Sequence, residues 1–226
     1  MCSSDLPDDA VVEHDVLQLG VYGDLFSIVQ MYVDAGNVLD APTGRLMTEL
    51  ADLAADRWRS KDAGMWELTD EQHFTTSKLG CWQALQHAAH LADLGQIPGD
   101  AERWRYEAGA IRAWVDEHCW SDALGAYEWY PGSGRLDASI LLHAISGFDR
   151  GDRMRSTLDA IERDLAFDGH VVRWSGAERE EEAFVACSFW MVAARAWCGQ
   201  VDLARERMEH LVATVPNDVG IMSEML

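Results

Sequence analysis

The sequence predicts an all-α protein built from helical hairpins. Apolar residues recur at helical spacing in one segment after another, and no convincing alternation typical of a strand is present. A glycine, an amide side chain and an aliphatic residue also recur together near the predicted helix ends, at residues 36–38, 95–97 and 199–201. Their separations are about one and about two units of roughly 50 residues, the size of one helical hairpin with its loop.

The apolar pattern places eight helices, and turn residues delimit several of them. The expected helices cover residues 15–35, 44–59, 75–94, 100–119, 135–147, 151–165, 181–198 and 201–214. Asp100 is a natural N-cap, Gly95 suits a left-handed helix end, and Pro42-Thr43 begins the second helix. Residues 124–134 and 168–178 are expected to form loops or short hairpins. Four hairpins are about four of the six in an (α/α)6 toroid, so an incomplete toroid is predicted.

Composition excludes several classes of partner. The 226 residues include 39 acidic and 18 basic side chains, for a formal net charge of −21. A nucleic acid or an anionic membrane requires a basic face, so we expect neither as a partner. No apolar run is long enough to span a bilayer. Ten tryptophans are an unusually large number and are a first indication of sugar binding. The oligomeric state is left open.

The cysteines indicate a reducing compartment. The five cysteines are scattered, form no CxxC pair, and have no neighbouring histidines at zinc-binding spacing. We therefore expect reduced, buried thiols in a cytoplasmic protein, with neither a metal nor a cofactor. The first nine residues lack the basic start and apolar stretch of a signal peptide.

Both ends of the sequence predict a fragment of a longer protein. Residues 1–6 are similar to the translation of a sequencing adapter read from a GTG start, and the chain ends at Leu226 with no polar tail or helix-ending signal. Residues 1–9 are therefore expected to be non-native or disordered, and residues 10–226 to be part of one domain. The alternative is a native short protein with unusual termini.

Two carboxylates are candidates for acid–base chemistry. Glu67 follows Trp66 in a loop between two predicted helices, where an indole face can stack on a pyranose while the carboxyl reaches a glycosidic oxygen. Glu224 follows the Asn217-Asp218 segment near the end of the chain. An inverting glycosidase needs two carboxyl groups about 6.5–9.5 Å apart, and a toroid gathers distant loops at one rim. With 39 acidic residues, spacing alone does not single out this pair.

The sequence resembles glycoside hydrolase family 15, the glucoamylase family, in the branch that holds bacterial glucoamylase-like enzymes and actinobacterial trehalases. The resemblance covers roughly residues 10–226. The blocks that carry it, in this order and spacing, are residues 18–24, 63–67, 73–78, 136–139, 156–162, 183–190 and 217–224. It implies an (α/α)6 catalytic domain and inversion at the anomeric carbon.

Five residues match functional positions of the family. The resemblance implies that Glu67 is the general acid and Glu224 the general base. It also implies that Trp66, Arg173 and Glu181 contact the sugar, although Trp66 is alternatively a core residue and Arg173 alternatively a surface or ion-pairing one. Where the family usually reads Gln-x-Asp, this chain has Gln18-Leu19-Gly20, and the family's upstream Arg-Asp pair is absent.

The predicted function is therefore that of an inverting glycoside hydrolase which releases glucose from α-linked glucosides. Glucoamylase-like attack on the non-reducing end of maltooligosaccharides is placed first, and an α,α-trehalase of the same family is the alternative. A non-catalytic sugar-binding relative or an α-hairpin interaction scaffold is the second alternative. The expected partner is accordingly an α-linked gluco-oligosaccharide or trehalose.

Overall fold

The computed structural model describes residues 17–177, 182–217 and 219–225, and helices dominate these ranges. Residues 1–9, expected to be non-native, lie outside them. The described α-helices are α1 (Val21–Asp34), α2 (Ala41–Arg57), α3 (Thr75–Asp93), α4 (Ala101–His118), α5 (Leu141–Ser146), α6 (Asp152–Leu165), α7 (Val185–Trp197) and α8 (Val201–Thr214). A 3-10 turn, η1 (Ala138–Ile140), leads into α5.

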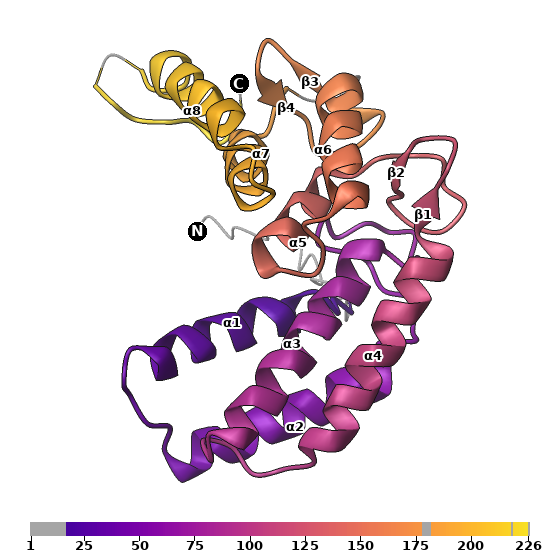
Figure 1. The fold of residues 1–226 in the computed structure, drawn as a ribbon, viewed down its shortest axis with the longest axis vertical. Coiled ribbons are helices and arrows are strands. Elements are labelled where there is room, and N and C mark those ends of the chain that lie inside the picture. Colours follow the sequence, from indigo (N-terminus) through magenta and orange to yellow (C-terminus); the bar gives the residue numbers. More distant parts are fainter. Residues whose placement is uncertain (1–16, 178–181, 218, 226) are drawn as a thin grey trace, which may run out of the picture.

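The helices follow one another in an open arc of hairpins, as the sequence predicts. The odd-numbered helices form a continuous row, because α1 packs against α3, α3 meets α5, and α5 packs against α7. The even-numbered helices cover this row: α2 and α4 pack on α3, while α6 and α8 pack on α7. Figure 1 shows α1 to α4 in one half of the molecule and α6 to α8 in the other, with α5 between them. The architecture is four of the six hairpins of an (α/α)6 toroid.

The predicted N-cap of α4 and the glycine after α3 are confirmed, whereas α2 begins at Ala41 rather than at residue 44. Asp100 caps α4 by accepting a hydrogen bond from the Arg103 backbone N–H at 3.0 Å, and Asp40 caps α2 in the same way from Thr43 at 2.8 Å. Gly95, just after α3, has a φ of 69°, in the left-handed region that favours glycine. Local sequence therefore sets these helix boundaries.

Three predicted helices, α1, α5 and α7, begin later than expected. Residues 17–20 precede α1 because their backbone bonds to the α2–α3 loop instead, with the Ala63 N–H donating to the Leu17 carbonyl at 3.0 Å. The helix expected over 135–147 begins only at η1, since residues 135–138 bond to the segment after α6, for example through the Ala138 N–H and the Arg173 carbonyl at 2.8 Å. The helix expected over 181–198 begins at Val185, since Phe184 just before it forms an isolated bridge with Met225. All three differences arise from pairing with distant segments.

Two small antiparallel ribbons interrupt the helices. β1 (Trp120–Ser121) pairs with β2 (Ala126–Tyr127), and β3 (Ala166–Phe167) pairs with β4 (His170–Val171). They overlap the two regions expected as loops or short hairpins. Each strand has only two residues, so the alternation of apolar and polar residues that would predict a strand cannot be recognised in the sequence.

Glycines allow α1 and α3 to approach closely beside the candidate site. A Cβ on Gly80 would lie 2.7 Å from the Gly20 Cα, and one on Gly23 would lie 2.8 Å from the Gly80 carbonyl oxygen. Real Cβ atoms do not tolerate such distances, so larger residues here would separate the two helices. This contact fixes the segment before α1 against the start of α3.

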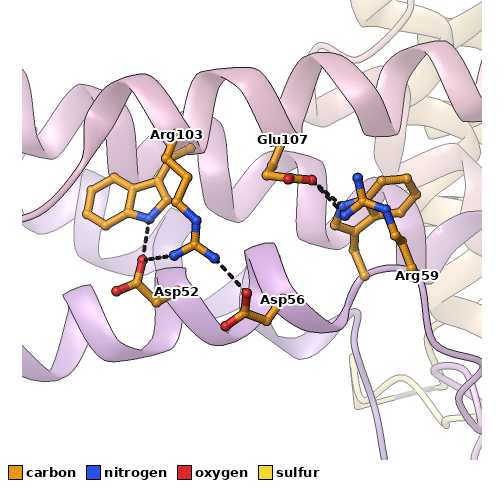
Figure 2. Close-up of polar contacts among 7 residues, drawn as sticks. Asp52, Asp56, Arg59, Arg103 and Glu107 are labelled. Atoms are coloured by element: carbon orange, nitrogen blue, oxygen red, sulfur yellow. Dashed lines mark hydrogen bonds and ion pairs between the residues drawn. The ribbon is translucent and has the colours of Figure 1, made fainter.

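Polar side chains connect α2 to α4 (Figure 2). Arg103 donates to Asp52 at 2.9 Å and to Asp56 at 2.6 Å. Glu107 accepts hydrogen bonds from Trp58 and Arg59, both at 2.8 Å. Most of these groups are partly exposed, so they align the two helices at the surface.

The core consists of aliphatic and aromatic side chains from all hairpins, and Trp104 is fully buried in it. Cys81, Cys119 and Cys198 are buried thiols outside any disulfide, and burial raises the pKa of Cys81 to about 12. Among the described residues, no helix has both the length and the apolar character needed to cross a membrane.

Candidate functional site

Trp66 and Glu67 form part of a tight turn in the α2–α3 loop. The Leu68 N–H closes the turn on the Ala63 carbonyl at 2.9 Å. Glu67 has a φ of 55°, in the left-handed region that is strained for a residue with a Cβ. This backbone costs about 1 kcal/mol, and such strain is concentrated at functional sites. The turn leaves the Glu67 side chain exposed.

Gln18 holds the Glu67 carboxylate. Its amide Nε2 donates to Glu67 Oε1 at 2.8 Å. The two residues are 49 positions apart, so the contact depends on the path of the segment before α1. The bond occupies one carboxyl oxygen of Glu67.

A buried carboxylate, Asp62, sets the position of Gln18. Its Oδ2 accepts the Leu19 N–H at 2.9 Å and the Ser77 hydroxyl at 2.8 Å. It therefore joins the segment before α1 to the first turn of α3. Burial raises the pKa of the Asp62 carboxyl, while these two donors act in the opposite direction. The Ala63 N–H holds the Leu17 carbonyl and Asp62 holds the Leu19 N–H, so both neighbours of Gln18 are fixed.

The Trp66 indole lies within a cluster of aromatic side chains. Its ring centroid is 5.6 Å from that of Trp174, 5.9 Å from Phe184 and 6.3 Å from Trp190. Trp174 stacks in turn on Trp129, with centroids 5.6 Å apart. The cluster offers apolar faces of the kind that pack against sugar rings, and Trp66 is only partly buried in it.

Asp137 fixes the polar edge of the indole. Its Oδ1 accepts the Trp66 Nε1–H at 2.9 Å, and its two oxygens also accept the Ser139 N–H and hydroxyl. Only 1% of Asp137 is exposed. Burial raises the pKa of Asp137 to about 6, against the opposing influence of the Ser139 and Trp66 donors.

Arg173 lies beside the same tryptophan. Its guanidinium carbon is 5.2 Å from the Trp66 ring centroid and 4.5 Å from that of Trp174. At these distances a cation is attracted to the ring faces. The structure therefore brings Arg173 and Trp66 together.

Phe184 connects the Glu224 segment to the cluster. The Val185 N–H donates to the Glu224 carbonyl at 2.9 Å, and Phe184 forms an isolated antiparallel bridge with Met225. Phe184 also contacts the Trp66 ring edge to face. The two carboxylates predicted from the sequence thus lie on segments that meet the same aromatic residue, and the Glu224 side chain is exposed.

A pocket of about 210 Å³ adjoins Gln18 between α1, α3 and α5. Asp24, Thr76 and His143 contribute polar side chains to its lining. His143 Nε2 lies 2.8 Å from the Thr76 hydroxyl, and burial lowers the pKa of His143 to about 3. The imidazole is therefore neutral across the physiological range.

One predicted site residue lies outside the described part of the chain, and the fold adds contacts that the sequence alone does not give. Glu181, expected to contact the sugar, lies outside the described residues. Asp137 and Gln18 belong to blocks that carry the resemblance, but only the fold reveals their contacts with Trp66 and Glu67. Trp190, on α7, also packs on Trp66. In the part of the chain that the structure describes, no three His, Cys, Asp or Glu side chains are grouped to hold a metal ion.

Comparison with known proteins places this arrangement in a family. The model of the family described as "Glycosyl hydrolases family 15" matches residues 8–224. The chain belongs to this family. A trehalase of Mycobacterium tuberculosis is 38% identical over 169 residues, which cover 71% of this chain and 25% of the relative. A trehalase of Mycolicibacterium smegmatis is 32% identical over 205 residues, which cover 87% of this chain and 30% of the relative. The chain thus spans less than a third of the length of these two relatives.

Solved structures share the fold of this family 15 chain. A glycosidase variant in complex with glucose gives a TM-score of 0.78 at 20% identity, covering 93% of this chain and 57% of that chain. A wild-type glycosidase gives the same TM-score at 19% identity and the same coverage. At this identity the likeness concerns the fold alone, and it supports the helical toroid.

Proposed function

We propose that the protein is an inverting glycoside hydrolase whose substrate is α,α-trehalose. Membership of family 15 supports the reaction class. The substrate is favoured by the curated relatives in M. tuberculosis and M. smegmatis, both of which are trehalases. The observation that carries the proposal is the meeting of the Trp66–Glu67 turn and the Glu224 segment at Phe184.

In the proposed reaction the two carboxyl groups have different roles. Glu67, protonated, donates its proton to the oxygen that joins the two glucose units, so that the C–O bond breaks and one glucose leaves as an alcohol. Glu224, ionised, takes a proton from a water that attacks the anomeric carbon from the opposite face. The attacked glucose is released in the β configuration. The leaving glucose keeps the α configuration.

The surrounding residues support binding of a sugar. The Trp66 face offers an apolar platform for a pyranose ring, and Arg173 offers hydrogen-bond donors beside it. Gln18 fixes one oxygen of Glu67, which leaves the other to carry the proton. The Glu67 side chain is exposed, where a substrate can reach it.

We also propose a cytoplasmic location. Cys81, Cys119 and Cys198 are buried thiols rather than disulfides. Scattered reduced cysteines are typical of proteins in a reducing compartment.

The test is glucose release from trehalose, maltose, maltooligosaccharides and isomaltose by the product of the complete gene. We expect trehalose to be hydrolysed with the highest kcat/KM. Preference for maltooligosaccharides would favour the glucoamylase-like activity that sequence analysis placed first. Binding of glucose without any hydrolysis would indicate a non-catalytic relative. The absence of both would contradict the proposal and favour an interaction scaffold.

A further inference from the structure

Asp137 is a buried carboxylate for which the proposed reaction has no role. It belongs to the loop between β2 and η1, and 1% of it is exposed. The donors on it are the Ser139 N–H, the Ser139 hydroxyl and the Trp66 indole. All of these are neutral groups. An ionised carboxylate is costly to bury without a cationic partner, so its retention here calls for an explanation.

Helix capping explains only part of this arrangement. Asp137 is the N-cap of η1, and one oxygen accepts the Ser139 N–H at 3.0 Å. Asp40 and Asp100 cap α2 and α4 through one backbone N–H each, and both remain exposed. Asp137 differs because it is buried and accepts an indole N–H from a residue 71 positions away.

The indole bond fixes the plane of the aromatic platform. Trp66 is otherwise held by ring contacts with Trp174, Phe184 and Trp190, and these permit sliding and rotation. The 2.9 Å bond from Nε1 to Asp137 is directional and removes that freedom. The backbone of Asp137 also pairs with Trp174, so the same residue positions two members of the aromatic cluster.

Because Glu67 follows Trp66 directly in the turn, the fixed orientation of the Trp66 indole also orients Glu67. Its φ of 55° is a strained conformation that persists only when its neighbours hold it. The turn is closed on one side by the Leu68 N–H and the Ala63 carbonyl. The Trp66 side chain anchors it on the other side.

We propose that Asp137 is a positioning residue, which holds the Trp66 indole and thereby orients the adjoining Glu67 carboxyl. The proposal rests on the proposed function of Glu67 for its catalytic consequence. The hydrogen bond itself can be tested without any substrate.

The first experiment measures the exchange of the Trp66 indole N–H with solvent in ¹H–¹⁵N spectra of the 226-residue chain. The Trp66→Phe variant identifies the signal by its disappearance. Because D137A removes the acceptor, the indole N–H should exchange about tenfold faster or more. D137N keeps a carbonyl oxygen at the same place and should restore slow exchange. S139A, the matched control, removes only the hydroxyl on the same carboxylate and should leave the indole unchanged.

The second experiment measures trehalose hydrolysis by the complete gene product. We expect D137A to lower kcat about 100-fold, because a displaced catalytic group loses its alignment, while KM changes little. D137N should recover most of this loss. Trp66→Phe keeps the ring but loses the donor, so it should lower kcat similarly, and combining it with D137A should add no further loss.

Three outcomes would overturn the proposal. They are an indole N–H in D137A that exchanges at the wild-type rate, a kcat in D137A equal to that of the wild type, and a full kcat in Trp66→Phe. If D137A fails to fold, the kcat of Trp66→Phe still tests the proposal. If the wild-type protein releases no glucose, the proposed function fails, and the exchange rates alone then decide whether Asp137 holds Trp66.

Discussion

In two regions of the molecule a tryptophan donates its indole N–H to a carboxylate distant in the sequence. Between α2 and α4, Trp104 donates to Asp52 at 2.9 Å, and Arg103 shares that carboxylate (Figure 2). In the site loops, Trp66 donates to Asp137, also at 2.9 Å. The Asp52 side chain is 44% exposed, whereas Asp137 is almost completely buried.

The comparison teaches that burial, rather than the bond itself, decides what such a contact is worth. Water solvates Asp52 and Asp56 in both the folded and the unfolded chain, so their contacts with Arg103 contribute little. The site carboxylate is removed from water, and within the described part of the chain its hydrogen-bond donors are all neutral. Substitutions in the site region should therefore affect turnover. Substitutions at the α2–α4 interface should affect only stability, and only slightly.

The largest effect is expected for Glu67→Gln. The amide keeps the shape of the side chain but has no acidic proton, so kcat for trehalose should fall roughly 10³-fold with substrate binding largely kept. Steady-state kinetics of the complete gene product measures this. Glu71→Gln, an exposed change in the same loop, is the matched control and should leave kcat unchanged. Near-normal turnover in Glu67→Gln would remove the residue from the mechanism.

The next effect concerns pH and His143. Its folded pKa of about 3 lies below the ordinary value of 6.5. The unfolded chain therefore binds a proton between these values that the folded chain does not. The stability that His143 contributes is complete above pH 6.5 and is lost as the pH falls toward 3.

Urea unfolding at pH 7 and pH 4.5 tests this expectation. Between pH 7 and pH 4.5, the free energy of unfolding should fall by about 2 kcal/mol more in the wild-type chain than in H143Q. Asp137 has the opposite effect on the pH dependence of stability. Because its pKa is raised to about 6 in the folded chain, the folded chain keeps a proton at pH values where the unfolded chain has already lost it. Comparing the two chains at each pH cancels that contribution. H90Q, at an exposed position on α3, is the control. Equal pH dependence in H143Q and the wild type would refute the expectation.

A smaller effect is expected for Gln18→Ala. Loss of the 2.8 Å bond leaves the Glu67 carboxyl free to rotate, so kcat should fall about tenfold while the melting temperature hardly changes. Gln72→Ala, in the α2–α3 loop, should have no effect on kcat. A drop in melting temperature that accounts for the whole loss of activity would make Gln18 a structural residue instead.

The smallest effect is expected at the helix interface. Arg103→Ala removes ion pairs with Asp52 and Asp56 from an arginine that is 38% exposed, and it should lower the free energy of unfolding by about 0.5 kcal/mol. Arg195→Ala is the contrasting variant. Arg195 also contacts two carboxylates, on Asp159 and Glu162, but is 2% exposed. Arg195→Ala should lower the free energy of unfolding by about 3 kcal/mol, because truncating a buried side chain leaves a cavity. Equal losses would contradict the role given to burial.

Much of the fold was predictable because local patterns determine it. The helix at 201–214 matches α8 at both ends, and the expected 75–94 matches α3 to one residue. The start of α5 was not predictable, because residues 135–137 pair with a segment that follows α6.

The site was predictable only as separate residues. The family resemblance identifies Glu67 and Trp66 as candidates, and the structure places Arg173 beside Trp66. The contacts of Gln18 and Asp137 span 49 and 71 positions. No local pattern encodes such contacts, because they depend on how three loops meet.

The most direct measurement is the anomeric form of the glucose released from trehalose, followed by proton NMR in the first minutes of hydrolysis. Inversion attacks one glucose and leaves the other unchanged, so α- and β-glucose should appear in equal amounts before mutarotation. Release of α-glucose alone would show retention and contradict the roles given to Glu67 and Glu224.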